Sequence, residues 1–355
     1  MLINKKSLLT TASVFALSAL SAPAFATTAV TGFVNAEYDQ FNIGNKSANP
    51  DQRPPYGGFD LQRVGIDFEH DQDIFTTIAQ LQFEHGPQVN NAGDGTGTNA
   101  SFGDGFGEIS LERAWIQARF DKAFHLRFGK EQTPTLWERA HYPVIYTSIT
   151  QPQIEENVFE EYLIGLLADG ELPYGFVYNL WLSKANNTFN TSATGSQQVT
   201  NGDELPPTAG FRFGWQTEVR GSYAIYLAAL GASYHDYLHS DTVANSTVWG
   251  IEGSLKWQGA TLWFEDSNSA STRGWYVLPS YTFELPHDME LSPYVLYDVF
   301  NDDSVGPESR KVFAGGLNFK PNSYMTIKGE GVWTQASNGE LANQAVRFGV
   351  IYSFN

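Results

Sequence analysis

The chain has 355 residues and no cysteine, so it cannot form a disulfide bond. Its formal net charge is −18 at pH 7, which argues against a nucleic-acid-binding protein, because binding to phosphates depends on lysine and arginine. The combination of 14% aromatic residues with 33 glycines suits strands that have one apolar face and are joined by polar loops.

The N-terminus has the pattern of a secretory signal peptide. Lys5 and Lys6 precede an apolar run over residues 8–20, and the small residues Ala24 and Ala26 occupy the two positions that a signal peptidase reads. We therefore expect cleavage after Ala26. The alternative is a retained anchor helix, but the apolar run is shorter than the about 20 residues that a membrane span needs.

After this signal, no segment offers about 20 consecutive apolar residues, so the sequence predicts no helical membrane span. Apolar and polar residues instead alternate over short segments, which indicates strands. We predict sixteen strands, at approximately residues 28–41, 60–70, 73–85, 108–120, 123–130, 160–168, 173–185, 208–219, 222–235, 246–257, 259–267, 274–285, 288–298, 310–320, 322–334 and 343–354.

The connections between these strands are alternately short and long. Residues 71–72 and 121–122 are short turns, whereas residues 86–107 and 131–159 are long loops. This asymmetry is typical of an antiparallel up-and-down barrel in the outer membrane, with short periplasmic turns and long external loops. The sequence thus predicts an all-β transmembrane barrel as a single domain over residues 27–355. A soluble β-sandwich is the alternative, but it would not need its long loops at one end.

The strand that ends the chain shows the alternation most clearly. Val346, Phe348 and Phe354 lie on one face, and Arg347 lies on the other. A charge on the lipid face at mid-depth costs roughly 2–4 kcal/mol, so each strand arginine is expected to point inward. The inward arginines predicted in this way are Arg63, Arg113, Arg119, Arg127 and Arg347.

The chain resembles the sixteen-stranded porins of Gram-negative bacteria. The resemblance covers the mature chain and consists of the export signal, the paired strands, the terminal aromatic strand and the stretch LRFGKEQTP from Leu126. That stretch is similar to the porin segment that leads from a strand into the third external loop. One departure is that Asn355 follows Phe354, whereas porins usually end on the aromatic residue itself.

The resemblance implies that the third external loop, at about residues 131–159, folds into the barrel and narrows it. The loop would then bring acidic residues opposite the inward arginines and create a transverse field across a pore constriction. The acidic residues assigned to this constriction are Glu131, Glu138, Glu155 and Glu156. The alternative is that these acids and arginines simply pair with one another along the wall.

The function implied is a water-filled outer-membrane channel for passive diffusion of small hydrophilic solutes and ions. A solute-specific channel for sugars or for organic or phosphate anions is the alternative. The resemblance also implies a homotrimer, embedded in outer-membrane lipid and lipopolysaccharide. We expect no enzymatic activity, no cofactor and no metal, because the sequence contains no nucleotide-binding or zinc-protease motif.

A barrel-embedded hydrolase is a remote alternative. It would need a serine, a histidine and a carboxylate or amide that meet on the outer wall near the external rim. His141, Ser148 and Asn157 lie in the third loop, but nothing in the sequence brings them together.

Overall fold

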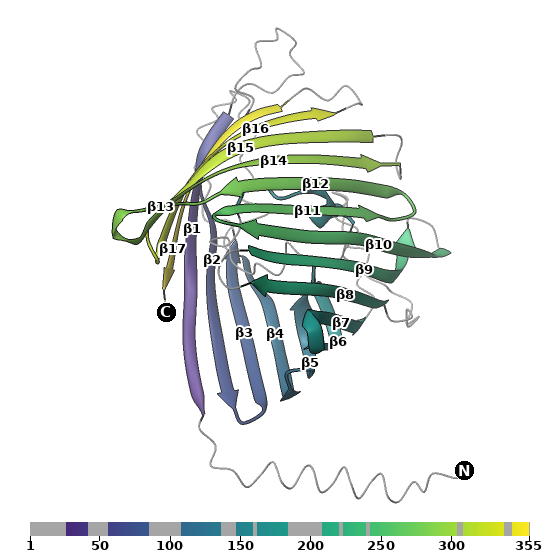
Figure 1. The fold of residues 1–355 in the computed structure, drawn as a ribbon. Helices are drawn as coiled ribbons and strands as arrows, with labels where there is room; N and C mark the ends of the chain where they lie inside the picture. Colours follow the sequence, from purple (N-terminus) through teal and green to yellow (C-terminus); the bar gives the residue numbers. More distant parts are fainter. Residues whose placement is uncertain are drawn as a thin grey trace, which may run out of the picture.

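The chain folds into one closed antiparallel sheet (Figure 1). The computed structural model describes residues 26–41, 56–84, 108–135, 147–158, 162–183, 208–219, 223–238, 242–303, 308–336 and 343–354. The predicted signal peptide lies almost entirely outside these residues, and so does the 86–107 loop.

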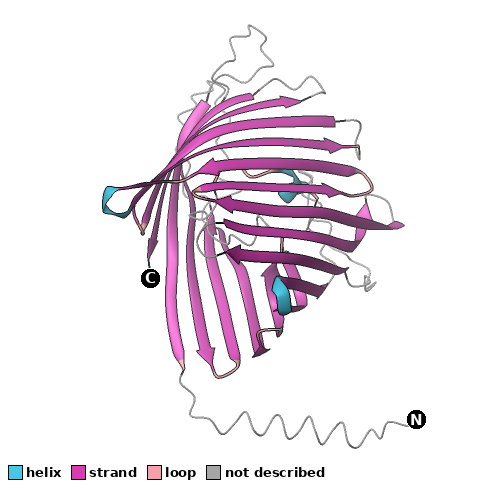
Figure 2. Cartoon of the chain, viewed as in Figure 1, coloured by secondary structure: helices cyan, strands magenta, loops and turns pink. Residues whose placement is uncertain are grey.

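Figure 2 shows that strands dominate the described residues, with only short helical turns between them. The strands are β1 (Thr27–Phe41), β2 (Tyr56–Gln72), β3 (Phe75–Glu84), β4 (Glu108–Asp121), β5 (Phe124–Gln132), β6 (Tyr162–Glu171), β7 (Phe176–Ser183), β8 (Thr208–Val219), β9 (Tyr223–Leu238), β10 (Thr242–Trp257), β11 (Ala260–Asn268), β12 (Thr272–Tyr281), β13 (Phe283–Leu285), β14 (Met289–Asp302), β15 (Glu308–Asn322), β16 (Met325–Ala336) and β17 (Asn343–Phe354). The helical pieces are α2 (Gln153–Asn157), η1 (Pro173–Gly175) and η2 (Pro286–Asp288).

The sheet closes because β1 pairs with both β2 and β17. β12 and β13 both pair with β14 and are separated only by Thr282, so they form one interrupted strand of the wall. With β12 and β13 counted as one strand, the described residues build a sixteen-stranded barrel, which confirms the predicted fold class and strand number. Closure leaves no free sheet edge to pair with another chain.

Several boundaries differ from the prediction. β9 and β10 remain paired as far as Leu238 and Thr242, so residues 236–238 and 242–245, predicted as loop, belong to strands. β5 continues to Gln132, so Glu131 belongs to the wall and not to the third loop.

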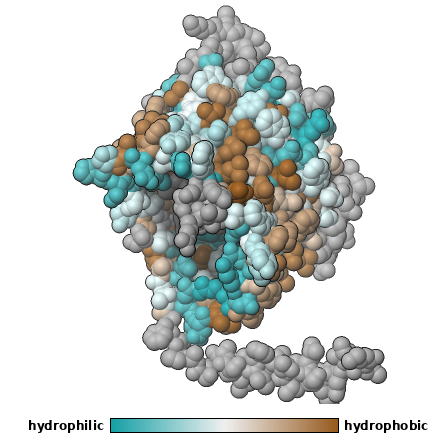
Figure 3. Space-filling view, in the orientation of Figure 1, coloured by the Kyte–Doolittle hydropathy of each residue, from teal (hydrophilic) through white to brown (hydrophobic). Residues whose placement is uncertain are grey.

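The two faces of the wall differ in burial as the alternation requires. On β14, Leu296 and Asp298 are fully buried, whereas Val295 is 38% exposed. On β16, Glu330 is buried and Ile327 is exposed. Figure 3 shows apolar residues gathered over parts of the strand wall, and hydrophilic residues at the tip that projects beyond β13.

The inner face is not uniformly polar. On the halves of the strands that adjoin the long loops, inward apolar side chains form one buried cluster with Ile154 and Val158. Its wall members include Leu163, Leu167, Trp181, Leu230, Phe300 and Val312. These side chains are buried from water, and Ile154 and Val158, which follow β5 in the chain, pack among them.

Among the described residues, no helix combines the length and the apolar character that a membrane crossing requires.

The outward face gives a first prediction. Ile116 lies in the middle of β4 and is 53% exposed, so an arginine there would place its charge against lipid. Ile116→Arg should lower the free energy of unfolding by about 2–4 kcal/mol, measured by urea titration in lipid vesicles. Glu69→Arg, on the inner face of β2, is the control and should unfold like the wild type. Equal losses for both variants would contradict the assignment of faces.

Candidate pore constriction

A segment of the loop between β5 and β6 lies against the inner wall on the other side of the barrel. We call residues 147–158 the inner segment. Their hydrogen-bond partners include inward side chains of β14, β15 and β16, about 150 to 180 positions further along the chain. The carbonyl oxygen of Thr147, for example, accepts a hydrogen bond from Nδ2 of Asn318 at 2.8 Å.

The strongest attachment of the inner segment is the carboxylate of Glu330 on β16. It accepts hydrogen bonds from the backbone N–H groups of Ile149 and Thr150, both at 3.0 Å. It also accepts from Oγ1 of Thr150 at 2.5 Å and from the hydroxyl of Tyr294 at 2.8 Å. Four donors fill the acceptor sites of one carboxylate, which explains how Glu330 is only 3% exposed.

A second attachment lies at the start of α2. The backbone N–H of Gln153 donates to Oδ2 of Asp298 at 2.8 Å, and Asp298 is fully buried on β14. Next to it, Ile154 is fully buried and its side chain occupies the space above Gly274 of β12, where any Cβ atom would collide with it. Carboxylates thus satisfy the backbone of the inner segment while a glycine makes room for its apolar side chain.

Glu155 connects the inner segment to a third part of the wall. Its Oε2 accepts a hydrogen bond from Oγ1 of Thr135 at 2.9 Å, and its carboxyl group lies next to that of Glu265 on β11. Both Thr135 and Glu155 are buried. The part of the loop just after β5 therefore meets the part just before β6 inside the barrel.

The predicted arginines are tied mainly to acids and amides of the wall. Arg113 is buried on β4, where its Nε donates to Gln80 at 2.8 Å and its Nη2 lies 3.6 Å from Asp67. Arg127 on β5 lies 3.0 Å from Glu131, one of the predicted loop acids. Pairing along the wall, the alternative left open by the sequence, thus accounts for these contacts.

Arg347 and Arg119 have different positions. Nη1 of Arg347 lies 3.4 Å from Oγ1 of Thr150, and its Nε lies 3.7 Å from Asp39. Arg347 is therefore the predicted arginine that reaches the inner segment. Arg119 pairs with Asp71 at 2.7 Å, and its side chain is 43% exposed beside the short turns. Arg119 belongs to the short-turn rim, because only two residues separate it from the turn after β4.

The remaining predicted site residues are less completely described. Arg63 lies on β2 and faces Glu84 of β3 in the register. Glu156 lies in α2, but its side chain is outside the described residues, and Glu138 is outside them altogether.

Sequence reasoning missed the wall residues that hold the loop. Glu330, Asp298 and Tyr294 have the inward parity of their strands, but alternation alone does not tell which inward residue meets a loop. It also missed the buried ion pair on the opposite wall, in which Glu252 of β10 lies 2.5 Å from Arg212 of β8.

The hydrolase alternative gains no support. Ser148 is buried inside the barrel, where its hydroxyl donates to the carbonyl oxygen of Thr150 at 2.8 Å, and not on the outer wall. His141 and the side chain of Asn157 lie outside the described residues. Within the described ranges, no three acidic or histidine side chains are grouped so that they could hold a metal ion.

No protein-family model and no curated protein sequence matches the chain. Solved structures do match it in fold. The anion-selective porin from Comamonas acidovorans superposes with a TM-score of 0.62 at 11% identity, over 93% of this chain and 100% of that one. The outer-membrane channel DcaP of Acinetobacter baumannii gives 0.61 at 13% identity, over 93% and 97%. The trimer form of OmpT, an outer-membrane protein of Vibrio cholerae, gives 0.56 at 11% identity, over 93% and 99%. The chain therefore has the fold of the outer-membrane porins.

The attachment at Glu330 gives a second prediction. Glu330→Ala removes the acceptor of two backbone N–H groups, so the amides of Ile149 and Thr150 should exchange with deuterium at least tenfold faster, about 1.4 kcal/mol. Hydrogen exchange of the refolded barrel, followed by mass spectrometry of the peptide around residues 147–158, measures this rate. Glu290→Ala is the matched control. Glu290 forms an ion pair with Lys320 at 3.3 Å, and it lies away from the inner segment. Unchanged exchange in Glu330→Ala would contradict the attachment.

Proposed function

We propose that the chain is an outer-membrane porin, a water-filled channel through which small hydrophilic solutes and ions diffuse passively. The observation that carries this proposal is the closed sixteen-stranded barrel, because barrels of sixteen to eighteen strands enclose an aqueous channel. The inner segment, held by Glu330 and Asp298, then narrows this channel.

Export and assembly belong to the same proposal. Residues 1–26 act as a signal peptide that is removed, and residues 27–355 form the barrel in the outer membrane, in contact with lipid and lipopolysaccharide. The barrel assembles as a homotrimer, which the trimer form of OmpT from Vibrio cholerae supports by analogy of fold. The protein catalyses no reaction and needs no cofactor.

Planar-bilayer recording of the refolded mature chain tests the proposal. Stepwise insertion with discrete ohmic conductance, in steps that tend to come in threes, supports an open trimeric porin. Stable insertion without conductance would overturn the proposed function, because a barrel with an open lumen must conduct ions.

The contact between Arg347 and the inner segment gives a third prediction. Arg347→Gln removes a positive charge at the narrowed part of the lumen, so the permeability ratio of K⁺ to Cl⁻ should rise about two- to fivefold. The reversal potential in a KCl gradient measures this ratio.

Arg119→Gln is the matched control. It removes the same charge at the short-turn rim, where salt screens a charge over about 8 Å and the side chain is 43% exposed. Its reversal potential should stay close to that of the wild type. Equal shifts in the two variants would show that the constriction does not lie at Arg347.

A further inference from the structure

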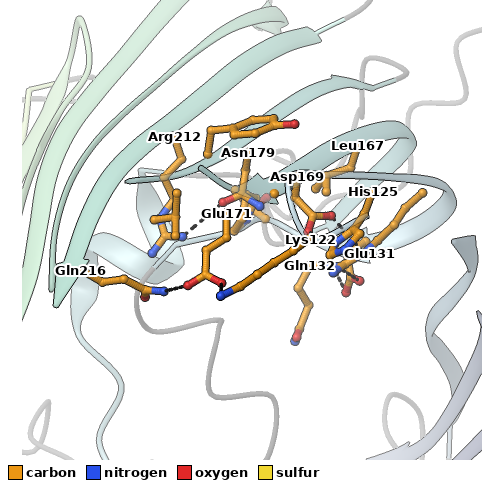
Figure 4. A pocket seen from close by; sticks show the side chains of 16 residues that line it. Lys122, His125, Glu131, Gln132, Leu167, Asp169, Glu171, Asn179, Arg212 and Gln216 are labelled. Carbon is orange, nitrogen blue, oxygen red and sulfur yellow. Dashed lines mark hydrogen bonds and ion pairs between the residues drawn. The ribbon is translucent and has the colours of Figure 1, made fainter. Parts of the chain in front are cut away.

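The inner wall contains a cavity on the short-turn half of β5–β8, and Figure 4 shows the side chains around it. We call it the β5–β8 pocket. Its volume is about 310 Å³, at the lower end of the range for pockets that hold small molecules. Gln132, Thr133 and Pro134, at the start of the loop after β5, contribute to its lining.

We propose that the β5–β8 pocket binds a small zwitterion, namely an α-amino acid with an apolar side chain. The proposal deepens the proposed function and rests on it in one respect, because the amino acid reaches the pocket through the lumen of the channel. The binding chemistry itself follows from the charges, the free hydrogen-bonding groups and the apolar surface of the lining.

The charges of the lining are balanced. The charged side chains, apart from His125, are Lys122, Arg127, Arg212, Glu131, Asp169 and Glu171. On the same inner face but outside the lining, Glu252 of β10 lies 2.5 Å from Arg212 and compensates its charge. An anion therefore meets no surplus of positive charge, and a cation competes with Lys122, which lies 2.6 Å from Glu171. A zwitterion adds no net charge and interacts favourably with both signs.

Asp169 offers acceptor capacity for an ammonium group. Its Oδ2 accepts a hydrogen bond from Nδ1 of His125 at 3.1 Å. Its Oδ1 lies 3.4 Å from Nε of Arg127 but accepts no hydrogen bond from the described residues. Oδ1 is itself buried from solvent, so an ammonium group would reach this carboxylate, whose side chain is 15% exposed, at Oδ2, which has a second acceptor site.

Donors for a carboxylate lie on the neighbouring strands. Oδ1 of Asn179 accepts from Nη1 of Arg212 at 3.2 Å, which orients the amide and leaves its NH₂ group without a partner among the described residues. In Arg127, Nε donates a hydrogen bond to Gln117 and Nη1 donates one to Glu131. The Nη2 group has no acceptor among the described residues. Free donors and a free acceptor on adjacent strands match the two ends of an amino acid.

The rest of the lining offers surface for a short apolar side chain. Val177 and Pro134 add apolar surface beside the charged groups, and both are partly exposed. The lining contains one aromatic side chain besides His125, that of Tyr178, whose hydroxyl donates to the carbonyl oxygen of Ala123 at 2.8 Å. This combination selects a solute with a charged head and a short hydrocarbon tail.

Binding to the refolded mature chain in detergent tests the proposal with three probes of one skeleton. L-leucine carries both charges, 4-methylpentanoate lacks the ammonium group, and 3-methylbutylammonium lacks the carboxylate. Saturable L-leucine binding by titration calorimetry is expected, with both analogues at least tenfold weaker, since one charged hydrogen bond contributes about 1.5–3 kcal/mol. Equal or tighter binding of either analogue, or no saturable binding of L-leucine, would overturn the proposal.

Two variants localise the site. Asp169→Asn should weaken L-leucine binding about tenfold, equivalent to about 1.4 kcal/mol, because the amide has less capacity to accept from the ammonium group. Asn179→Ala removes free donors without removing a charge and should weaken binding in the same direction, which keeps the test valid if the first variant misfolds. Glu290→Gln, on β14 and outside the pocket, should bind like the wild type. Unchanged binding in both pocket variants would place the site elsewhere and overturn the proposal.

Recording in a planar bilayer separates this proposal from the proposed function. If the protein conducts but neither binds L-leucine nor shows a reduced current in its presence, the amino-acid pocket is overturned and the porin function is supported. If the barrel binds L-leucine but never conducts, the porin function is overturned and the amino-acid pocket is supported.

Discussion

The interior of the barrel depends on two buried carboxylates that accept hydrogen bonds from the backbone of a loop. Irregular backbone at membrane depth is tolerated only where protein or a water-filled cavity satisfies its N–H and C=O groups. Glu330 satisfies the N–H groups of Ile149 and Thr150, and Asp298 satisfies that of Gln153. Because both acids project from the rigid wall, the inner segment is fixed in position.

This attachment makes the two sides of the lumen unequal. Along β12, β14 and β15 the inner segment covers apolar wall residues, which could not line a wet channel by themselves. Arg347 on β17 faces Glu330 of β16 in the register, so it lies on the wall that holds the inner segment, close to Asp39 on β1. On β5–β8 the proposed amino-acid pocket is lined by charged and polar side chains, whereas Leu163 and Trp181 of the same strands belong to the apolar cluster.

The wall could be predicted from the sequence because alternation is a local signal. In β4 and β17, apolar and polar residues alternate, and this pattern alone indicates which face of the wall each residue occupies. The sixteen strands and the inward arginines can therefore be predicted without knowledge of the partner strands. The inner attachment could not be predicted in this way, because Ile149 and Glu330 are 181 positions apart and no local pattern pairs them. The same limit led to Arg119 being placed at the constriction and Glu131 in the loop. The roles of Glu138 and Glu156 stay predictions.

The most direct test of this account is the single-channel conductance of Glu330→Ala beside that of the wild type, at the same salt concentration. The account predicts a larger and noisier conductance in the variant, because the inner segment loses its acceptor and moves away from its fixed position in the lumen. An equal or smaller conductance, with the barrel still folded, would contradict the claim that Glu330 holds the segment that narrows the channel.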